Sequence, residues 1–230
     1  MKIAILVTGI PSAGLGQRFG DYPAMFRALL GDAFQYASYM ACEGDLPERP
    51  ENHDAYIVTG SPAGVYENLP WIAPLEDFLR AAKGKAKLVG ICFGHQVMAQ
   101  AFGGRVAKSE HGWGVGLHRY RVEERAPWMD DVACFAIPVS HQDRVVEPPP
   151  HSRLLASGEY NRYGLIAYDD QPAISFQCHP EFTPAYAAAL IEVRRDRLPD
   201  PDGAIASLEQ PNDRALVATW IRRFLRDEAA

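Results

Sequence analysis

The chain has no long hydrophobic run. Its 230 residues are 47% hydrophobic and 23% charged, yet the longest apolar stretches have only the length of a β-strand. A membrane-spanning helix needs about 20 consecutive apolar residues, so we expect no membrane partner. Single hydrophobic cores commonly stop growing near roughly 250 residues. We therefore expect one domain over residues 1–230.

A concentrated basic region is also absent. Acidic and basic residues are interleaved, and 29 Asp and Glu against 23 Lys and Arg give a formal net charge of -6. Proteins that bind nucleic acid instead gather Lys and Arg on one face, so we expect no nucleic-acid partner. The chain shows no internal repeat and no low-complexity tract, which argues against solenoid and linker architectures.

Cysteine is scarce and widely spaced. The four cysteines, at positions 42, 92, 134 and 178, lack the close C-x-x-C spacing of metal sites and redox motifs. No secretory signal peptide is recognisable before them, which favours reduced thiols and a cytoplasmic location. His111, His118 and His151 lack metal-ligand spacing as well. We expect neither a metal nor a cofactor.

Strand and helix patterns alternate over the first hundred residues. Continuous apolar, β-rich stretches are typical of parallel strands buried on both faces. The strands expected on this basis are Lys2–Gly9, Ala55–Gly60 and Ala86–Cys92. The helices expected between and after them are Tyr22–Leu30, Pro70–Lys85 and His95–Phe102. This order predicts an α/β fold with a doubly wound, mostly parallel sheet flanked by helices.

After Arg105 the pattern changes to short β-rich runs separated by Pro- and Asp-containing turns. Such runs predict an antiparallel β extension of the sheet. They are Leu117–Val122, Cys134–Ser140, Gly164–Asp169 and Ala173–His179. Two helices are expected to end the chain, roughly Pro184–Arg197 and Asp213–Arg226, the second packed as a lid on the sheet. Glu147–Pro150 and Leu198–Gly203 are expected to be exposed turns.

Cys92 lies in a motif that can present a nucleophile. Residues Gly90–Gly94 match the G-x-nucleophile-x-G pattern of a sharp strand-to-helix turn. The glycines allow the strained backbone that such a turn requires. The free N–H groups at the start of the following helix favour a thiolate and can stabilise an oxyanion, with the N–H of Phe93 as the first oxyanion arm. The alternative is a buried cysteine followed by an ordinary turn.

Two further motifs offer partners for this cysteine. His179 follows an apolar strand, with Glu181 two residues later, so a Cys-His-Glu relay would use His179 as base and Glu181 to orient its ring. The small-residue loop Thr59–Glu67 follows another strand, and its N–H groups could form a second oxyanion arm. The alternatives are a satisfied surface histidine and an ordinary turn.

In this chain order, the upstream Gly loop, the elbow cysteine and the downstream H-P-E resemble the class I glutamine amidotransferases. The resemblance extends over essentially the whole chain and implies a flavodoxin-like α/β fold. It also implies that Cys92 forms a γ-glutamyl thioester, with His179 as base and Glu181 as its orienter. No cofactor is implied.

The resemblance also implies roles around the triad. The backbone of Gly60 and Ser61 resembles the oxyanion loop, and Gln96 resembles a residue near the bound glutamyl group. His141, in S-H-Q-D, is a candidate for the acceptor side of the pocket; the alternative is a surface turn. Two departures stand out: many members read S-G-G-P where this chain has T-G-S-P, and Phe commonly stands where this chain has Cys178.

The resemblance further extends to free-standing plant γ-glutamyl peptidases and to the glutaminase domain of GMP synthetase. Only two expected helices follow Glu181, where many family members have a synthase. We therefore expect a hydrolase of γ-glutamyl amide bonds, in glutamine or a γ-glutamyl conjugate. The alternatives are an ammonia-supplying glutaminase subunit of a separate synthase and a non-catalytic binding protein of the same fold. Substrate specificity is expected in the loops Pro11–Asp21, Glu110–Gly116 and His141–Arg144.

Overall fold

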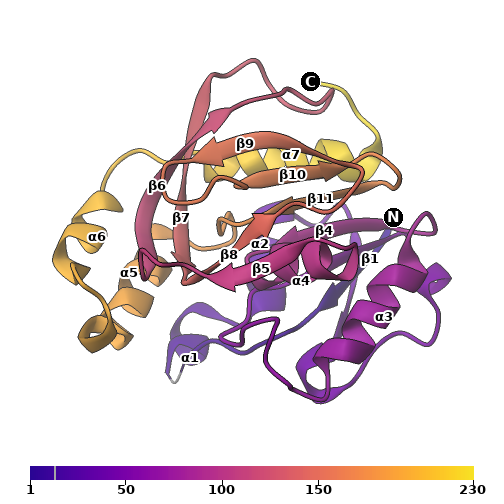
Figure 1. The fold of residues 1–230 in the computed structure, drawn as a ribbon, viewed down its shortest axis with the longest axis horizontal. Helices are drawn as coiled ribbons and strands as arrows, with labels where there is room; N and C mark the ends of the chain where they lie inside the picture. Colours follow the sequence, from indigo (N-terminus) through magenta and orange to yellow (C-terminus); the bar gives the residue numbers. More distant parts are fainter. Residues whose placement is uncertain (13) are drawn as a thin grey trace.

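A mixed β-sheet forms the centre of the computed structural model, which describes residues 1–12 and 14–230 (Figure 1). Its parallel half contains, in spatial order, β2 (Gln35–Tyr39), β1 (Lys2–Leu6), β3 (Ala55–Val58), β4 (Lys87–Ile91) and β11 (Ala173–Phe176). Its antiparallel half continues with β10 (Leu165–Tyr168), β9 (Ser152–Gly158), β6 (Gly114–Val122) and β7 (Cys134–His141). β11 joins the halves because it is parallel to β4 and antiparallel to β10.

Helices cover both faces of this sheet. One face packs against α2 (Tyr22–Leu30) and α7 (Arg214–Arg226), and the other against α3 (Ile72–Ala82) and α4 (Phe93–Ala101). A third group, α1 (Leu15–Phe19), α5 (Pro184–Val193) and α6 (Pro201–Ser207), packs near β6 and β7. A small antiparallel sheet pairs β5 (Arg105–Lys108) with β8 (Asp143–Glu147). Single 3₁₀ turns occur at Ala41–Glu43, Pro50–Asn52 and Arg195–Arg197.

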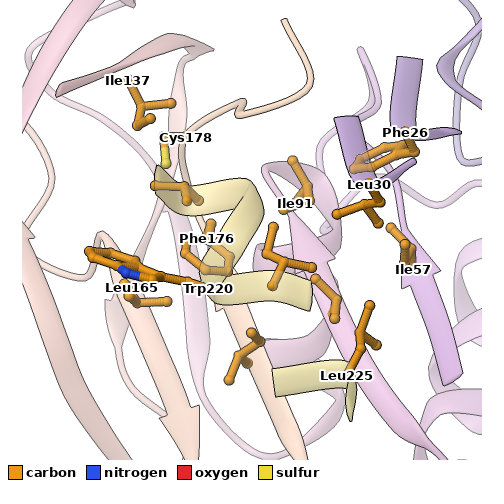
Figure 2. Packing of buried hydrophobic residues seen from close by; sticks show 14 of the residues in the cluster. Phe26, Leu30, Ile57, Ile91, Ile137, Leu165, Phe176, Cys178, Trp220 and Leu225 are labelled. Carbon is orange, nitrogen blue, oxygen red and sulfur yellow. The ribbon is translucent and has the colours of Figure 1, made fainter. Parts of the chain in front are cut away.

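The largest hydrophobic cluster ties the antiparallel half of the sheet to α7. Trp220 is fully buried, lies edge-on to Phe135 at a centroid distance of 5.2 Å, and donates its ring N–H to Asp130 at 2.9 Å. Figure 2 shows Trp220 of α7 in the same cluster as Ile91 of β4 and Phe26 of α2. The lid role expected for the last helix is confirmed by these contacts.

The observed sheet confirms the doubly wound, mostly parallel architecture with an antiparallel extension. The helix over Tyr22–Leu30 also has the expected bounds: the Asp21 side chain accepts the Ala24 N–H, and Gly31 ends it with a φ of 81°.

Three expectations about the later segments are wrong. The run over Ala173–His179 is a strand only to Phe176; its antiparallel pairing with β10 was expected, whereas its parallel pairing with β4 was not. Leu198–Gly203 is not simply a turn, since α6 begins at Pro201, where the Asp200 side chain accepts the Gly203 N–H at 3.0 Å. The helix beginning at Pro184 ends as an α-helix at Val193. Strands β2, β5, β8 and β9 were not expected at all.

None of the helices in the described ranges has both the length and the apolar character needed to cross a membrane.

Candidate active site

Cys92 stands at the turn between β4 and α4. Its backbone angles, φ 54° and ψ -102°, are unusual for a residue with a side chain. Its N–H donates to the Phe176 carbonyl at 2.8 Å, which fastens the turn to β11. A methyl group on Gly90 would lie 2.6 Å from the Gly94 carbonyl oxygen, and one on Gly94 would collide with Val58. Both glycines are therefore required by the close approach of backbone segments.

The loop after β3 lies directly against this turn. The Gly94 N–H donates to the Thr59 carbonyl at 3.1 Å. A methyl group on Gly60 would lie 2.9 Å from Cε1 of His179 and 3.7 Å from Cβ of Cys92. The Ser61 hydroxyl accepts the Ala63 N–H at 3.2 Å and so stabilises the loop itself. The backbone at Gly60 is thus beside both candidate reactive side chains.

His179 and Glu181 form a buried pair. Their side chains are joined by a 2.6 Å hydrogen bond between Nδ1 and Oε1, and their residues are 3% and 2% exposed. The His179 N–H donates to the Pro138 carbonyl of β7 at 2.9 Å. The Phe182 ring stacks on the imidazole with centroids 3.9 Å apart and planes 3° from parallel. These contacts fix the ring in one orientation.

The charge environment of His179 favours its protonated form. Burial lowers the pKa of the imidazole, but the carboxylate of Glu181 and the thiolate of Cys92 raise it, and the net pKa lies above the usual 6.5. The protonated ring is the form that can donate a proton during a reaction. An imidazolium next to a thiolate is the form in which a cysteine attacks a carbonyl carbon.

His141 belongs to the same site and is not part of a surface turn. It is 3% exposed, and its Nδ1 lies 3.0 Å from the Asp143 carbonyl oxygen. Burial lowers the pKa of this histidine to about 3, so the ring is neutral at physiological pH. The preceding residue, Ser140, accepts the Cys92 thiol at its carbonyl oxygen, with 4.0 Å between sulfur and oxygen.

Gln96 links α4 to the β7–β8 turn. Its side-chain amide donates to the Asp143 carbonyl at 2.9 Å and to the Gln177 side chain at 3.1 Å. Because both N–H groups of the amide are used in this way, the side-chain carbonyl is the group that can meet a ligand.

These segments surround a cavity of about 240 Å³. Six of the residues expected from the sequence line it: Gly60, Ser61, Cys92, Gln96, His141 and His179. The other two, Phe93 and Glu181, are buried behind it. Phe93 is the first residue of α4, where helix geometry leaves the N–H without an intrahelical acceptor.

Sequence reasoning missed part of the cavity wall. Tyr22, Leu190 and Arg194 line it outside any motif, and Phe182 lines it as the residue directly after H-P-E, without an assigned role. Each loop expected to set specificity does reach the cavity, through Ser12, Trp113 and the turn at His141. Ala13, in the first of these loops, lies outside the described residues. Among the residues described, no three His, Cys, Asp or Glu side chains are grouped to hold a metal ion.

The fold and cavity define an α/β protein with a candidate Cys-His-Glu site. The family model "Glutamine amidotransferase class-I" matches residues 35–192. Because that span is more than half of the chain, the protein belongs to the class I glutamine amidotransferase family. This confirms the resemblance drawn from the motifs.

Similar proteins agree with this membership. A glutamine amidotransferase-like protein of Schizosaccharomyces pombe is 30% identical, over 97% of this chain and 98% of that protein. Gamma-glutamyl peptidase 4 of Arabidopsis thaliana is 29% identical, over 79% of this chain and 76% of the peptidase. The crystal structure of a glutamine amidotransferase from Thermotoga maritima superposes with a TM-score of 0.77 at 16% identity, covering 98% of both chains. The last likeness supports the fold.

Proposed function

We propose that the protein hydrolyses γ-glutamyl amide bonds through a thioester on Cys92. The observation that carries this proposal is the hydrogen-bonded pair of His179 and Glu181, buried beside a cysteine held at a positive φ. Membership in the glutamine amidotransferase family and the similarity to a γ-glutamyl peptidase support this class of substrate.

In the first half-reaction, the Cys92 thiolate attacks the γ-carbonyl carbon. The carbonyl oxygen gains negative charge, and the N–H groups of Phe93 and the Gly60–Ser61 loop stabilise it. The C–N bond then breaks as His179 transfers its proton to the departing amine. The products are a γ-glutamyl thioester and a free amine.

In the second half-reaction, water attacks the thioester carbonyl. His179, now neutral, accepts a proton from this water, and the C–S bond breaks to return the thiolate. Glutamate leaves, and the Glu181 carboxylate stabilises the imidazolium that forms again. The four cysteines are free, which supports the reducing environment of the cytoplasm as the place where this chemistry operates.

The proposal is tested by measuring glutamate release from glutamine, γ-glutamylglycine and γ-glutamyl methylamide. We expect the wild-type protein to hydrolyse at least one of them. Cys92→Ala should lower that activity by at least ~1,000-fold with an unchanged circular dichroism spectrum. A glutamine-analogue electrophile should label Cys92 and not Cys134, the exposed cysteine.

Three results would speak against the proposal. Labelling elsewhere, found by peptide mapping, would contradict the assignment of Cys92. Activity that survives in Cys92→Ala would exclude a thioester. Turnover of glutamine that becomes substantial only when a separate synthase is added would favour the glutaminase-subunit alternative, and binding of γ-glutamyl compounds without turnover would favour a binding protein.

A further inference from the structure

Arg194 is a cation held in place at the wall of the cavity. It follows the last residue of α5, is partly buried, and lines the same cavity as Cys92. Its Nη1 donates to the Ser140 hydroxyl at 2.9 Å, and its guanidinium carbon lies 5.3 Å from the centre of the Trp113 ring. The Ser140 hydroxyl thus holds one edge of the guanidinium, and the Trp113 ring lies against its plane.

Within the part of the chain that the structure describes, most of the hydrogen-bonding capacity of Arg194 is unused. A guanidinium has five N–H donors, and the bond to Ser140 uses one of them. Within residues 1–12 and 14–230, Arg194 takes part in none of the ion pairs. The next residue is different, because Arg195 pairs with Glu192 at 2.7 Å and with Asp202 at 2.9 Å. Arg194 therefore retains a charge and donors for a ligand in the cavity.

The position of Arg194 indicates which part of the substrate it meets. The departing amine must lie next to His179, because His179 gives it a proton. On that side, Phe182 stacks on His179, and Tyr22 stacks on Phe182 with centroids 6.2 Å apart. Trp113, whose ring lies under the Arg194 guanidinium, packs against the same hydrophobic cluster as Tyr22 and Phe182, so Arg194 lies at this part of the cavity wall.

The part of the cavity lined by Tyr66 and Asp143 has a different charge pattern. The carboxylate of Asp143 accepts the Tyr66 hydroxyl at 2.8 Å. Burial raises the pKa of Asp143, and the charges that act on it are those of Lys108 and Glu67. Asp143, Glu67 and Lys108 thus give this part of the cavity both signs of charge, whereas Arg194 lines the cavity beside Trp113 and Ser140.

We propose that Arg194 binds a carboxylate carried by the leaving amine, and that the preferred substrates are γ-glutamyl amino acids or peptides. This inference rests on the proposed function and names its substrate class. The planar guanidinium suits a carboxylate because two parallel N–H···O bonds can form. This carboxylate takes no part in bond breaking: the γ-glutamyl C–N bond breaks, the nitrogen receives the His179 proton, and the free amino acid departs.

The test compares two substrates that differ in this carboxylate. The quantity measured is the ratio of kcat/KM for γ-glutamylglycine to kcat/KM for γ-glutamyl methylamide. We expect the wild-type ratio to exceed one, and Arg194→Gln to lower it by about 10- to 100-fold, the usual effect of losing a charge-assisted hydrogen bond. Arg194→Lys keeps the positive charge but cannot form two parallel hydrogen bonds to a carboxylate. Its ratio should lie between those of the wild-type protein and Arg194→Gln.

Arg195→Gln is the matched control, since it removes the same charge one residue away from the cavity wall. Its ratio should equal that of the wild-type protein. An equal fall of kcat/KM for both substrates in Arg194→Gln would overturn the inference, because Arg194 would then serve the γ-glutamyl part or the fold. Failure of the wild-type protein to hydrolyse any γ-glutamyl amide would instead refute the proposed function, and with it the inference.

Discussion

Under the proposed mechanism, Glu181 orients the base His179, so a change at Glu181 tests the orientation while the base itself stays in place. Its carboxylate raises the pKa of His179. Under the proposed mechanism, kcat/KM falls at alkaline pH as His179 loses its proton. Glu181→Gln should lower the pKa of His179 and move this alkaline limb to lower pH, while costing less activity than His179→Ala, which loses a contribution of about 10²- to 10⁴-fold. pH–rate profiles of the three proteins measure both effects.

Glu192→Gln is the control for this experiment, because Glu192 is an exposed residue paired with Arg195. Its alkaline limb should coincide with that of the wild-type protein. A limb that stays in place in Glu181→Gln, or an activity loss as large as that of His179→Ala, would contradict the division of roles between the two residues.

The candidate site residues within motifs could be predicted from the sequence, but the residues that surround them in the cavity could not. His179, Glu181 and Cys92 stand out because each lies at a recognisable break after an apolar run. Arg194 follows a helix with no motif, and its role depends on Trp113 and Ser140, which reach it only through the fold. Spacing in the chain contains no information about such distant contacts.

At the level of elements, the contact between α4 and β3 depends on the absence of a side chain at Gly94. A methyl group there would overlap the Val58 carbonyl group. Gly94→Ala should therefore push the helix away from the strand, lower the free energy of unfolding by about 3 kcal/mol or more, and reduce activity by displacing Cys92. Thermal unfolding and glutamate release measure the two consequences.

Gly16→Ala in α1 provides the comparison. Its nearest neighbour would be Cβ of Pro11 at 3.9 Å, an ordinary contact, and alanine favours a helix over glycine. Its stability should be equal to or above that of the wild-type protein. Equal melting temperatures for both variants would show that α4 tolerates the displacement and would contradict the argument.

Helices and strands with strong local sequence signals could be predicted well. Strands that depend on pairing with a neighbouring strand could not. The helix over Tyr22–Leu30 has a cap, a Pro near its start and a terminal Gly, so its bounds follow from the sequence. Strand β2 is exposed to intermediate in burial and lacks the apolar run of its neighbour β1. The direction of β11 depends on its pairing with β4, which no local pattern specifies.

The whole molecule depends on α7 to cover the antiparallel half of the sheet. Trp220 fills the space between this helix and Phe135. Trp220→Ala should lower the free energy of unfolding by about 3–5 kcal/mol, measured by urea denaturation. Trp113→Ala, at the partly buried cavity wall, should cost less. If Trp220→Ala and Trp113→Ala lowered the free energy of unfolding by similar amounts, the special dependence of the sheet on α7 would be contradicted.

The position of Cys92 in the chain also affects when, during synthesis, the protein can begin to cleave amides. The proposed nucleophile, Cys92, emerges from the ribosome well before His179, Glu181 and Arg194. At about 5–20 residues per second, roughly 5 to 20 s separate Cys92 from Arg194. A nascent chain thus holds an ordinary thiol, without a base or a strained turn fastened to β11. Under the proposed function, amide cleavage begins only after nearly the entire chain has been made.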